Sequence, residues 1–145
     1  MKTNQIDYSQ LDPKCIPLVK FFNAVGLKTI MCCEGHSNRS VHKFWIEFSK
    51  EITDEDIFNF MEKVNPMYYS CKKSEEQLIG QFHKIAYGKD SNGNFRINWK
   101  YIVDFDGHYE MNQKLALRDL EIFQKAFPFI QLDNDQTNDK DYESL

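Results

Sequence analysis

The sequence predicts an α+β fold, and the order of its hydrophobic patterns carries this prediction. A helix-type apolar repeat opens the chain, and two units follow in which two strand patterns precede one helix pattern. The expected order is α-ββα-ββα. Because each strand pair is joined by a short connection, we expect a mainly antiparallel sheet with the helices packed on one face. A chain of 145 residues with 41% hydrophobic content suits a single compact domain over residues 1–132.

The first helix is expected to begin at Asp12, with Pro13 or Pro17 in its first turn, and to end at Gly26. Its apolar residues recur at helical spacing: Leu18, Val19, Phe22 and Val25. Such a stripe packs against a core, so this helix should lie against the sheet.

The first strand pair is expected over residues 28–33 and 43–49. In its second strand, alternation places Trp45 away from the core face, which carries Phe44, Ile46 and Phe48. A second helix should begin at Thr53, with Asp56 completing a capping box, and should end before Pro66. Residues 66–80 are then expected to form a polar connector.

The second strand pair gives the strongest local pattern in the chain. We expect strands over residues 82–87 and 95–105, joined by a turn at 91–94 that contains Asn92-Gly93. Alternation in the long strand predicts a core face made of Phe95, Ile97, Trp99, Tyr101, Val103 and Phe105. A last helix over residues 109–127 should end before Pro128.

Charge separates the body of the chain from its C-terminal end. Residues 133–145 contain five acidic residues and one lysine, which accounts for the whole formal net charge of -4, and we expect this acidic tail to be disordered. The remaining body is nearly neutral, so broad nucleic-acid binding through many phosphates is not expected. The sequence has no signal-peptide pattern and no apolar run of about 18 residues. We therefore expect a cytoplasmic protein that does not bind membranes.

Chemically reactive side chains concentrate where the first expected strand ends. Cys32, Cys33, Glu34 and His36 follow an apolar run, and Gly35 allows the chain to turn. Cys33, Glu34 and His36 are the candidate catalytic residues, because a thiol or a carboxylate beside an imidazole supports nucleophilic or acid–base catalysis. The alternative is that Glu34, Ser37 and Asn38 are turn-forming residues that hydrogen-bond their own main chain.

The cysteines are expected to be thiols in a reducing compartment, since a chain of this size needs no disulfides. Alternation along the strand places Cys32 and Cys33 on opposite faces, and a buried thiol acts as a small apolar side chain. Cys32 or Cys33 with His36 forms half of a zinc-binding pattern. The other candidate ligands are isolated in the sequence, so no metal and no other cofactor is expected: Cys71, His83 and His108.

Binding of a nucleotide-like or otherwise anionic molecule is the preferred interpretation of this region. The candidate binding residues lie in the turn and the strand that follows it: His36, Ser37, Asn38, Arg39, Lys43 and Trp45. Arg39 and Lys43 would neutralise negative charge, and Trp45 would stack on a ring. Asp106-Gly107-His108-Tyr109 ends the second strand pair in a similar way, with a turn as its simplest interpretation.

The segment that leads into this turn resembles known proteins. Small proteins of bacteriophages and Firmicutes share a helix, a strand and a Cys-(Glu/Gln)-Gly-His turn, and this chain resembles them in Pro17-Leu18-Val19-Lys20-Phe21-Phe22-Asn23, Gly26-Leu27-Lys28-Thr29 and Cys33-Glu34-Gly35-His36. This resemblance implies inhibition of host defence, either by binding a host protein or by sequestering a nucleotide signal. More remotely, the segment is similar to the opening of the tRNA wybutosine-synthesising methyltransferase family. That similarity implies S-adenosylmethionine-dependent tRNA methylation with Cys33 and Gly35 at the site, although His36 stands where that family has arginine.

Taken together, these patterns favour a small-ligand-binding protein over an enzyme. The phage-like resemblance adds a host defence protein as a second partner and the host cytoplasm as the location, and self-association into a homo-oligomer is a third partner type. Two alternatives stay open: a methyltransferase-like tRNA modifier that uses the Cys33-Glu34-Gly35-His36 turn, and a protein-binding inhibitor of a host factor.

Overall fold

A computed structural model describes residues 6–36, 42–70, 78–105 and 107–132. Two 3-10 helices, η1 (Tyr8–Gln10) and η2 (Pro13–Cys15), precede the α-helices α1 (Ile16–Ala24), α2 (Asp54–Ser70) and α3 (Tyr109–Ala126). The strands are β1 (Thr29–Cys33), β2 (Phe44–Phe48), β3 (Gln81–Lys89) and β4 (Phe95–Val103). The predicted α+β class and the order of the elements are confirmed.

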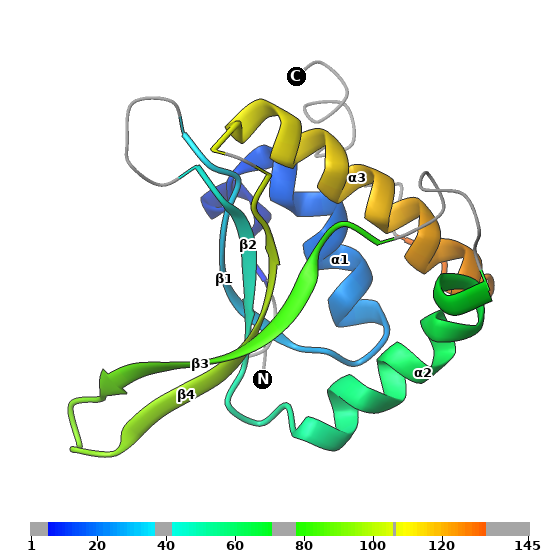
Figure 1. The fold of residues 1–145 in the computed structure, drawn as a ribbon. Helices are drawn as coiled ribbons and strands as arrows, with labels where there is room; N and C mark the ends of the chain where they lie inside the picture. Colours follow the sequence, from blue (N-terminus) through cyan, green and yellow to red (C-terminus); the bar gives the residue numbers. More distant parts are fainter. Residues whose placement is uncertain (1–5, 37–41, 71–77, 106, 133–145) are drawn as a thin grey trace.

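The four strands form one antiparallel sheet in the order β1-β2-β4-β3. All three α-helices lie on one side of this sheet (Figure 1). We call the other side the outer face. The register places Trp45 between Cys33 of β1 and Ile102 of β4, and it places Glu47 beside Lys100. These side chains belong to the outer face, because the residues that alternate with them are buried under the helices.

Aromatic side chains fill the space between the sheet and the helices. Phe22 of α1 lies 5.1 Å from Phe48 of β2 and 5.6 Å from both Tyr101 of β4 and Phe123 of α3, measured between ring centroids. Most of these ring pairs are edge-on or tilted, which is the arrangement that the ring quadrupoles favour. One hydrophobic core therefore joins all three helices to the sheet.

Helix α2 begins as predicted and ends later than predicted. The Thr53 main-chain N–H donates to Asp56 Oδ2 at 2.9 Å, and the Asp56 N–H donates to Thr53 Oγ1 at 3.1 Å, which is a reciprocal capping box. The prediction that the helix ends before Pro66 is wrong, because α2 continues to Ser70. Proline removes one main-chain hydrogen bond, and this loss does not outweigh the packing of the helix on α3. The predicted connector at 66–80 is therefore helical over its first residues, while 71–77 lie outside the described residues.

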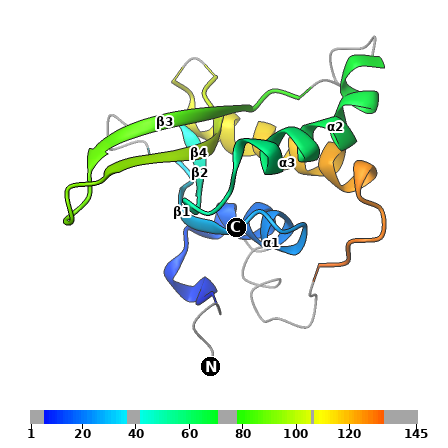
Figure 2. The same cartoon turned by 90° about the horizontal axis from the view of Figure 1, so that it is seen from below.

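The β3–β4 hairpin extends beyond the helices (Figures 1 and 2). For this reason the predicted core face of β4 is buried only in part: Tyr101 and Val103 are fully buried, whereas Phe95 is 71% exposed and Ile97 is 46% exposed. Phe105 is also exposed and lies beyond the end of the strand. Alternation identified the strand correctly, but none of the described helices covers the first residues of β4, which include Phe95 and Ile97.

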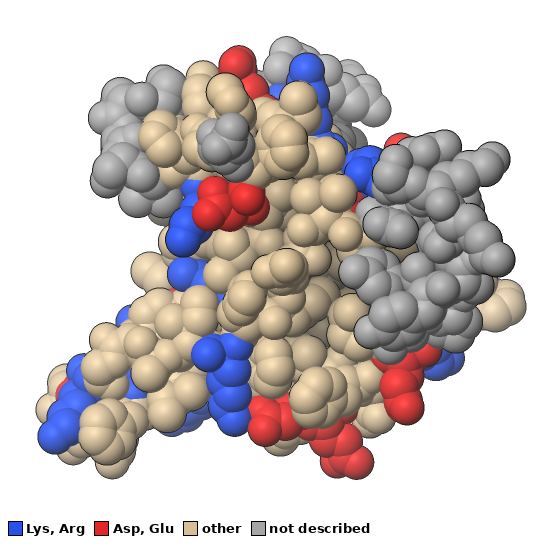
Figure 3. All heavy atoms as spheres, in the orientation of Figure 1, with Lys and Arg blue, Asp and Glu red and all other residues tan. Residues whose placement is uncertain are grey.

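An aspartate organises the loop of this hairpin. Asp90 Oδ1 accepts hydrogen bonds from the main-chain N–H groups of Asn92 and Asn94 at 2.9 and 3.0 Å. Gly93 takes a positive φ of 83°, as the predicted Asn-Gly turn requires. Figure 3 shows Lys and Arg side chains along this hairpin and acidic side chains over the first turn of α2. Within the described ranges, no helix combines the length and apolar character needed to cross a membrane.

Candidate functional site

The turn after β1 is held in place by hydrogen bonds from two separate elements, η2 with its N-cap residue Asp12, and α3. The Glu34 N–H donates to Asp12 Oδ2 at 3.0 Å, and Glu34 Oε1 accepts from the Lys14 N–H at 2.8 Å. From α3, Gln113 Nε2 donates to the Glu34 carbonyl oxygen at 3.1 Å. The Glu34 carboxylate thus binds the main chain that leads into α1, and not the main chain of its own turn.

Gly35 sits where no other residue fits. Its φ is +87°, and a Cβ at this position would lie 2.7 Å from the main-chain oxygen of His42 and 3.2 Å from Tyr109 Cβ. Asn112 of α3 joins the same region, since its side chain donates to the His42 carbonyl oxygen at 2.9 Å and accepts from the Phe105 N–H at 2.5 Å. The ends of the first and second strand pairs therefore meet at the start of α3.

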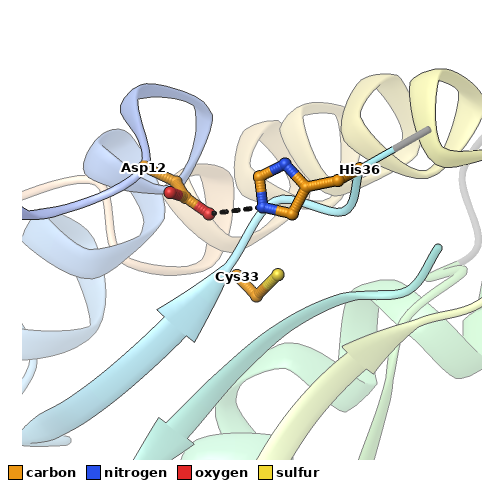
Figure 4. Close-up of side chains that lie close together, drawn as sticks. All are labelled: Asp12, Cys33 and His36. Carbon is orange, nitrogen blue, oxygen red and sulfur yellow. Dashed lines mark ion pairs between the residues drawn. The ribbon is translucent and has the colours of Figure 1, made fainter. Parts of the chain in front are cut away.

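Three reactive side chains converge at this turn: Asp12, Cys33 and His36 (Figure 4). One potential ligand atom from each residue lies within 4.8 Å of the other two, and all three residues are half-buried. His36 Nε2 lies 3.6 Å from Asp12 Oδ2. The Gly35 N–H also donates to Cys33 Sγ at 3.4 Å, which stabilises negative charge on the sulfur.

Cys32 faces the opposite side of β1, as alternation predicts. It packs against the core beside Cys15, which is fully buried, and both residues are thiols. Burial raises the pKa of Cys15, whereas a hydrogen bond from Cys15 lowers the pKa of Cys32. Cys32 is therefore the thiol of this pair with the lower pKa, and the hydrogen bond with Cys15 is the main cause.

Cations and aromatic rings alternate across the outer face. Lys100 Nζ lies 3.9 Å from the centre of the Trp45 ring and 5.2 Å from that of Tyr87. Tyr87 also contacts Arg96, whose guanidinium carbon lies 4.7 Å from the ring centre. The series Trp45, Lys100, Tyr87 and Arg96 thus connects β2, β4 and β3. Each contact is a cation–π interaction in a partly buried setting.

A buried carboxylate supports this series from within the sheet. Glu47 is 1% exposed, and its two oxygens accept from Arg96 at 3.0 and 2.9 Å and from Asn98 at 2.6 Å. Burial and then the Glu47 charge raise the pKa of Tyr87 to about 12. Burial is also the main reason that the pKa of Lys100 is lowered, and the neighbouring charges of Lys43 and Arg96 lower it further while Glu47 opposes this.

A groove of about 460 Å³ lies on the outer face, over β3 and β4. Ile102, which pairs with Trp45 in the sheet, lines it together with His83 and Ile85 of β3. Lys43 stands at one end, 3.9 Å from Asp104. The groove therefore combines an apolar floor with charged groups at its margin, which suits a ligand that has both a ring and a charge.

The structure brings the predicted catalytic candidates Cys33 and His36 together with Asp12, whereas the Glu34 carboxylate binds the Lys14 N–H instead. Trp45 pairs with Cys33, and Lys43 lines the groove. The other predicted binding residues lie outside the described residues: Ser37, Asn38 and Arg39. Sequence reasoning missed three members of this region: Asp12, Arg96 and Lys100. Asp12 has the local pattern of a helix start. Arg96 and Lys100 could have been found as the polar half of the β4 alternation.

No protein-family model, curated protein or solved structure matches this chain, so its function has to be argued from the geometry of the site itself.

Proposed function

We propose that this protein binds a small anionic molecule of the nucleotide class on the outer face of its sheet. One observation carries the proposal: Lys100 lies over the Trp45 ring, on the same face as a groove of about 460 Å³ that is lined by Ile102, the partner of Trp45 in the sheet. The half-buried Lys100 ammonium can pair with the anionic group of a ligand, and the half-exposed Trp45 indole beside it can contact the ligand's aromatic ring.

The electrostatics of the face favour a bound anion. Lys100 and Arg96 lie on the same side of β4, and the only carboxylate between them in the described part of the sheet, Glu47, is already bound by Arg96 and Asn98. Lys43 adds a third cation in the lining of the groove, where it lies 3.9 Å from Asp104. Because burial disfavours the charge on Lys100, an anion that pairs with it regains part of the solvation that folding removed.

We expect the residues predicted from the turn to take part in binding as well. His36 would hydrogen-bond the ligand, with Ser37 and Asn38, and Arg39 would neutralise further charge. The resemblance to phage proteins makes a nucleotide signal the ligand to test first, bound and withheld without chemistry.

The proposal can be tested by the fluorescence of Trp45 in a protein that lacks the other tryptophan, Trp99. Trp99 lies on the helix side, where its indole donates to Asp54 Oδ1 at 2.8 Å and its ring meets Phe58 edge-on, so W99F removes its emission while keeping a ring in place. The W99F protein would be titrated with mononucleotides, cyclic dinucleotides, inorganic phosphate and a short single-stranded oligonucleotide. We expect a saturable change with one of the nucleotides.

Variants of single cations identify the binding face. K100A should weaken binding about tenfold or more, since a charge-assisted hydrogen bond contributes about 1.5–3 kcal/mol. R39A should weaken it to a similar extent. K125A is the matched control, because Lys125 is an exposed lysine on α3 in the opposite layer. The proposal is wrong if no nucleotide changes the Trp45 emission, if K100A and K125A behave alike, or if only the oligonucleotide binds.

A further inference from the structure

We propose that Asp12, Cys33 and His36 form a binding site for a divalent transition-metal ion of the zinc type. The three side chains come from the residue before η2, the last residue of β1 and the turn that follows it (Figure 4). Their sulfur, nitrogen and oxygen ligand atoms lie within 4.8 Å of one another. His36 is shared with the nucleotide proposal, but that proposal is carried by Lys100 and Trp45, so each can be true without the other.

The spacing of Asp12 and His36 fits two ligands of one ion better than it fits a direct hydrogen bond. Asp12 Oδ2 lies 3.6 Å from His36 Nε2, whereas a direct N–H···O bond is about 2.7–3.2 Å long. Oxygen and nitrogen ligands with bonds of about 2.0–2.2 Å to a tetrahedral ion lie roughly 3.4 Å apart. The carboxylate and the imidazole are therefore already separated by about the distance that a bound ion needs.

The position of the thiol distinguishes a metal site from a catalytic triad. In a triad the nucleophile and the carboxylate face opposite nitrogens of the histidine ring. Here the Cys33 sulfur lies on the side of the imidazole that carries Nε2, the nitrogen that also faces Asp12 (Figure 4). All three ligand atoms thus converge on one point instead of forming a relay through the ring.

Main-chain N–H groups donate hydrogen bonds to two of these ligands. The Glu34 N–H donates to Asp12 Oδ2 at 3.0 Å, and the Gly35 N–H donates to Cys33 Sγ at 3.4 Å. Hydrogen bonds of this kind orient metal ligands and are part of their affinity. Metal binding would transfer the thiol proton of Cys33 to solvent and leave a thiolate on the ion.

The donor set predicts which ions bind. One thiolate, one imidazole and one carboxylate suit Zn²⁺ and Co²⁺, whereas Mg²⁺ and Ca²⁺ require oxygen ligands. Three protein ligands leave a fourth tetrahedral position for water or for an incoming ligand. This arrangement is typical of zinc sites that carry out chemistry or bind a small molecule.

Absorption spectra of the Co²⁺ complex show directly whether the Cys33 thiolate is bound to the metal. The full chain, stripped of metal with a chelator and kept reduced, would be titrated with Co²⁺ alone, without any nucleotide. We expect saturation at one equivalent, with a thiolate-to-cobalt charge-transfer band and the visible bands of four-coordinate cobalt. Adding Zn²⁺ should remove both, whereas Mg²⁺ should leave them unchanged.

Ligand variants and matched controls locate the ion. C33S should abolish the charge-transfer band, and H36A and D12N should each weaken Co²⁺ binding more than tenfold. C32S and H83A are the controls, because Cys32 faces the core and His83 lies in β3 with its ring bound to Gln81. Circular dichroism would show that each variant is folded, and D12N and H36A test the site independently if C33S is not.

Three results would contradict the proposed metal site. One is the absence of a charge-transfer band in the wild-type protein, and another is a band that survives C33S or disappears in C32S. The third is rapid alkylation of Cys33 at a rate that saturating Zn²⁺ does not change, which would indicate a thiol–imidazole pair. Failure of the nucleotide titration leaves all of these outcomes unaffected, so the two proposals can be tested separately.

Discussion

Lys100 Nζ lies 3.9 Å from the centre of the Trp45 ring, on neighbouring strands of the outer face. Burial lowers the pKa of this lysine below its usual value of 10.5, and the charges of Lys43 and Arg96 act in the same direction. The positive charge of Lys100 therefore disappears at a lower pH than that of an exposed lysine. The role of Lys100 in anion binding can therefore be tested by measuring how the affinity for an anion changes with pH.

Affinity for an anionic ligand should decrease as the pH rises from neutrality toward 10.5, because Lys100 loses its proton within this range. In K100R the affinity should stay nearly constant over the same range, since arginine keeps its charge. Titration calorimetry with a ligand of constant charge would measure both. A parallel decrease in the wild-type protein and in K100R would show that another group is responsible.

Breaking the ion pair between Arg96 and Glu47 should destabilise the fold. R96A leaves the carboxylate of Glu47 buried without its cation, so we expect the free energy of unfolding to fall by about 1–3 kcal/mol. Adding E47Q to R96A should restore part of this loss, because the remaining group is neutral. Urea denaturation measures both effects.

K89A is a suitable control for this pair, since Lys89 lies on the same hairpin and only contacts the Phe95 ring at 5.3 Å. Its effect should stay below about 1 kcal/mol, the scale of an exposed cation–π contact. Equal losses in R96A and K89A would contradict a structural role for the ion pair.

Replacing Gly35 with alanine should disturb the turn that carries the site. G35A places a Cβ 2.7 Å from the His42 oxygen and also forces an alanine into a positive φ. G93A is the matched control: it has a similar φ of +83° but nothing within 4 Å of the new Cβ. We expect G93A to cost about 1–2 kcal/mol from backbone strain alone and G35A to cost clearly more. Equal unfolding free energies for the two variants would contradict this packing.

Asp119 should make stability depend on pH in a defined direction. Its carboxylate accepts from the Tyr101 hydroxyl and the Gly80 N–H at 2.7 Å and from the Ile79 N–H at 2.9 Å, so it holds the segment before β3 against β4. Burial raises its pKa above the usual value of 3.8, although these hydrogen bonds oppose the shift.

As the pH rises through 3.8, Asp119 ionises in the unfolded chain before it does so in the folded protein. Wild-type stability should therefore decrease relative to D119N from pH 3.8 up to the raised pKa and then stay level. The lost hydrogen bond in D119N adds a constant difference of about 1–3 kcal/mol. Urea denaturation at several pH values tests this. A difference between the two proteins that does not change with pH would contradict it.

Features that depend on neighbouring residues were predicted correctly from the sequence. The capping box of α2 joins Thr53 and Asp56, which are three residues apart, so both hydrogen bonds follow from local geometry. Alternation in β2 placed Trp45 on the side away from the core for the same reason. Errors arose where burial depends on distant elements. Phe95 and Ile97 continue the alternation of β4, but the helices end before they can cover them.

The sequence by itself determined the α+β class, the order of the elements and the turn at Cys33-Glu34-Gly35-His36, because periodicity, capping and glycine conformation act over a few residues. Only the tertiary structure decided that Asp12 joins Cys33 and His36 and that Lys100 covers Trp45. Asp12 is bound to Glu34, 22 residues later in the chain, and Lys100 meets Trp45 through strand register. Such contacts depend on how α1 and four strands pack together, and no local pattern carries that information.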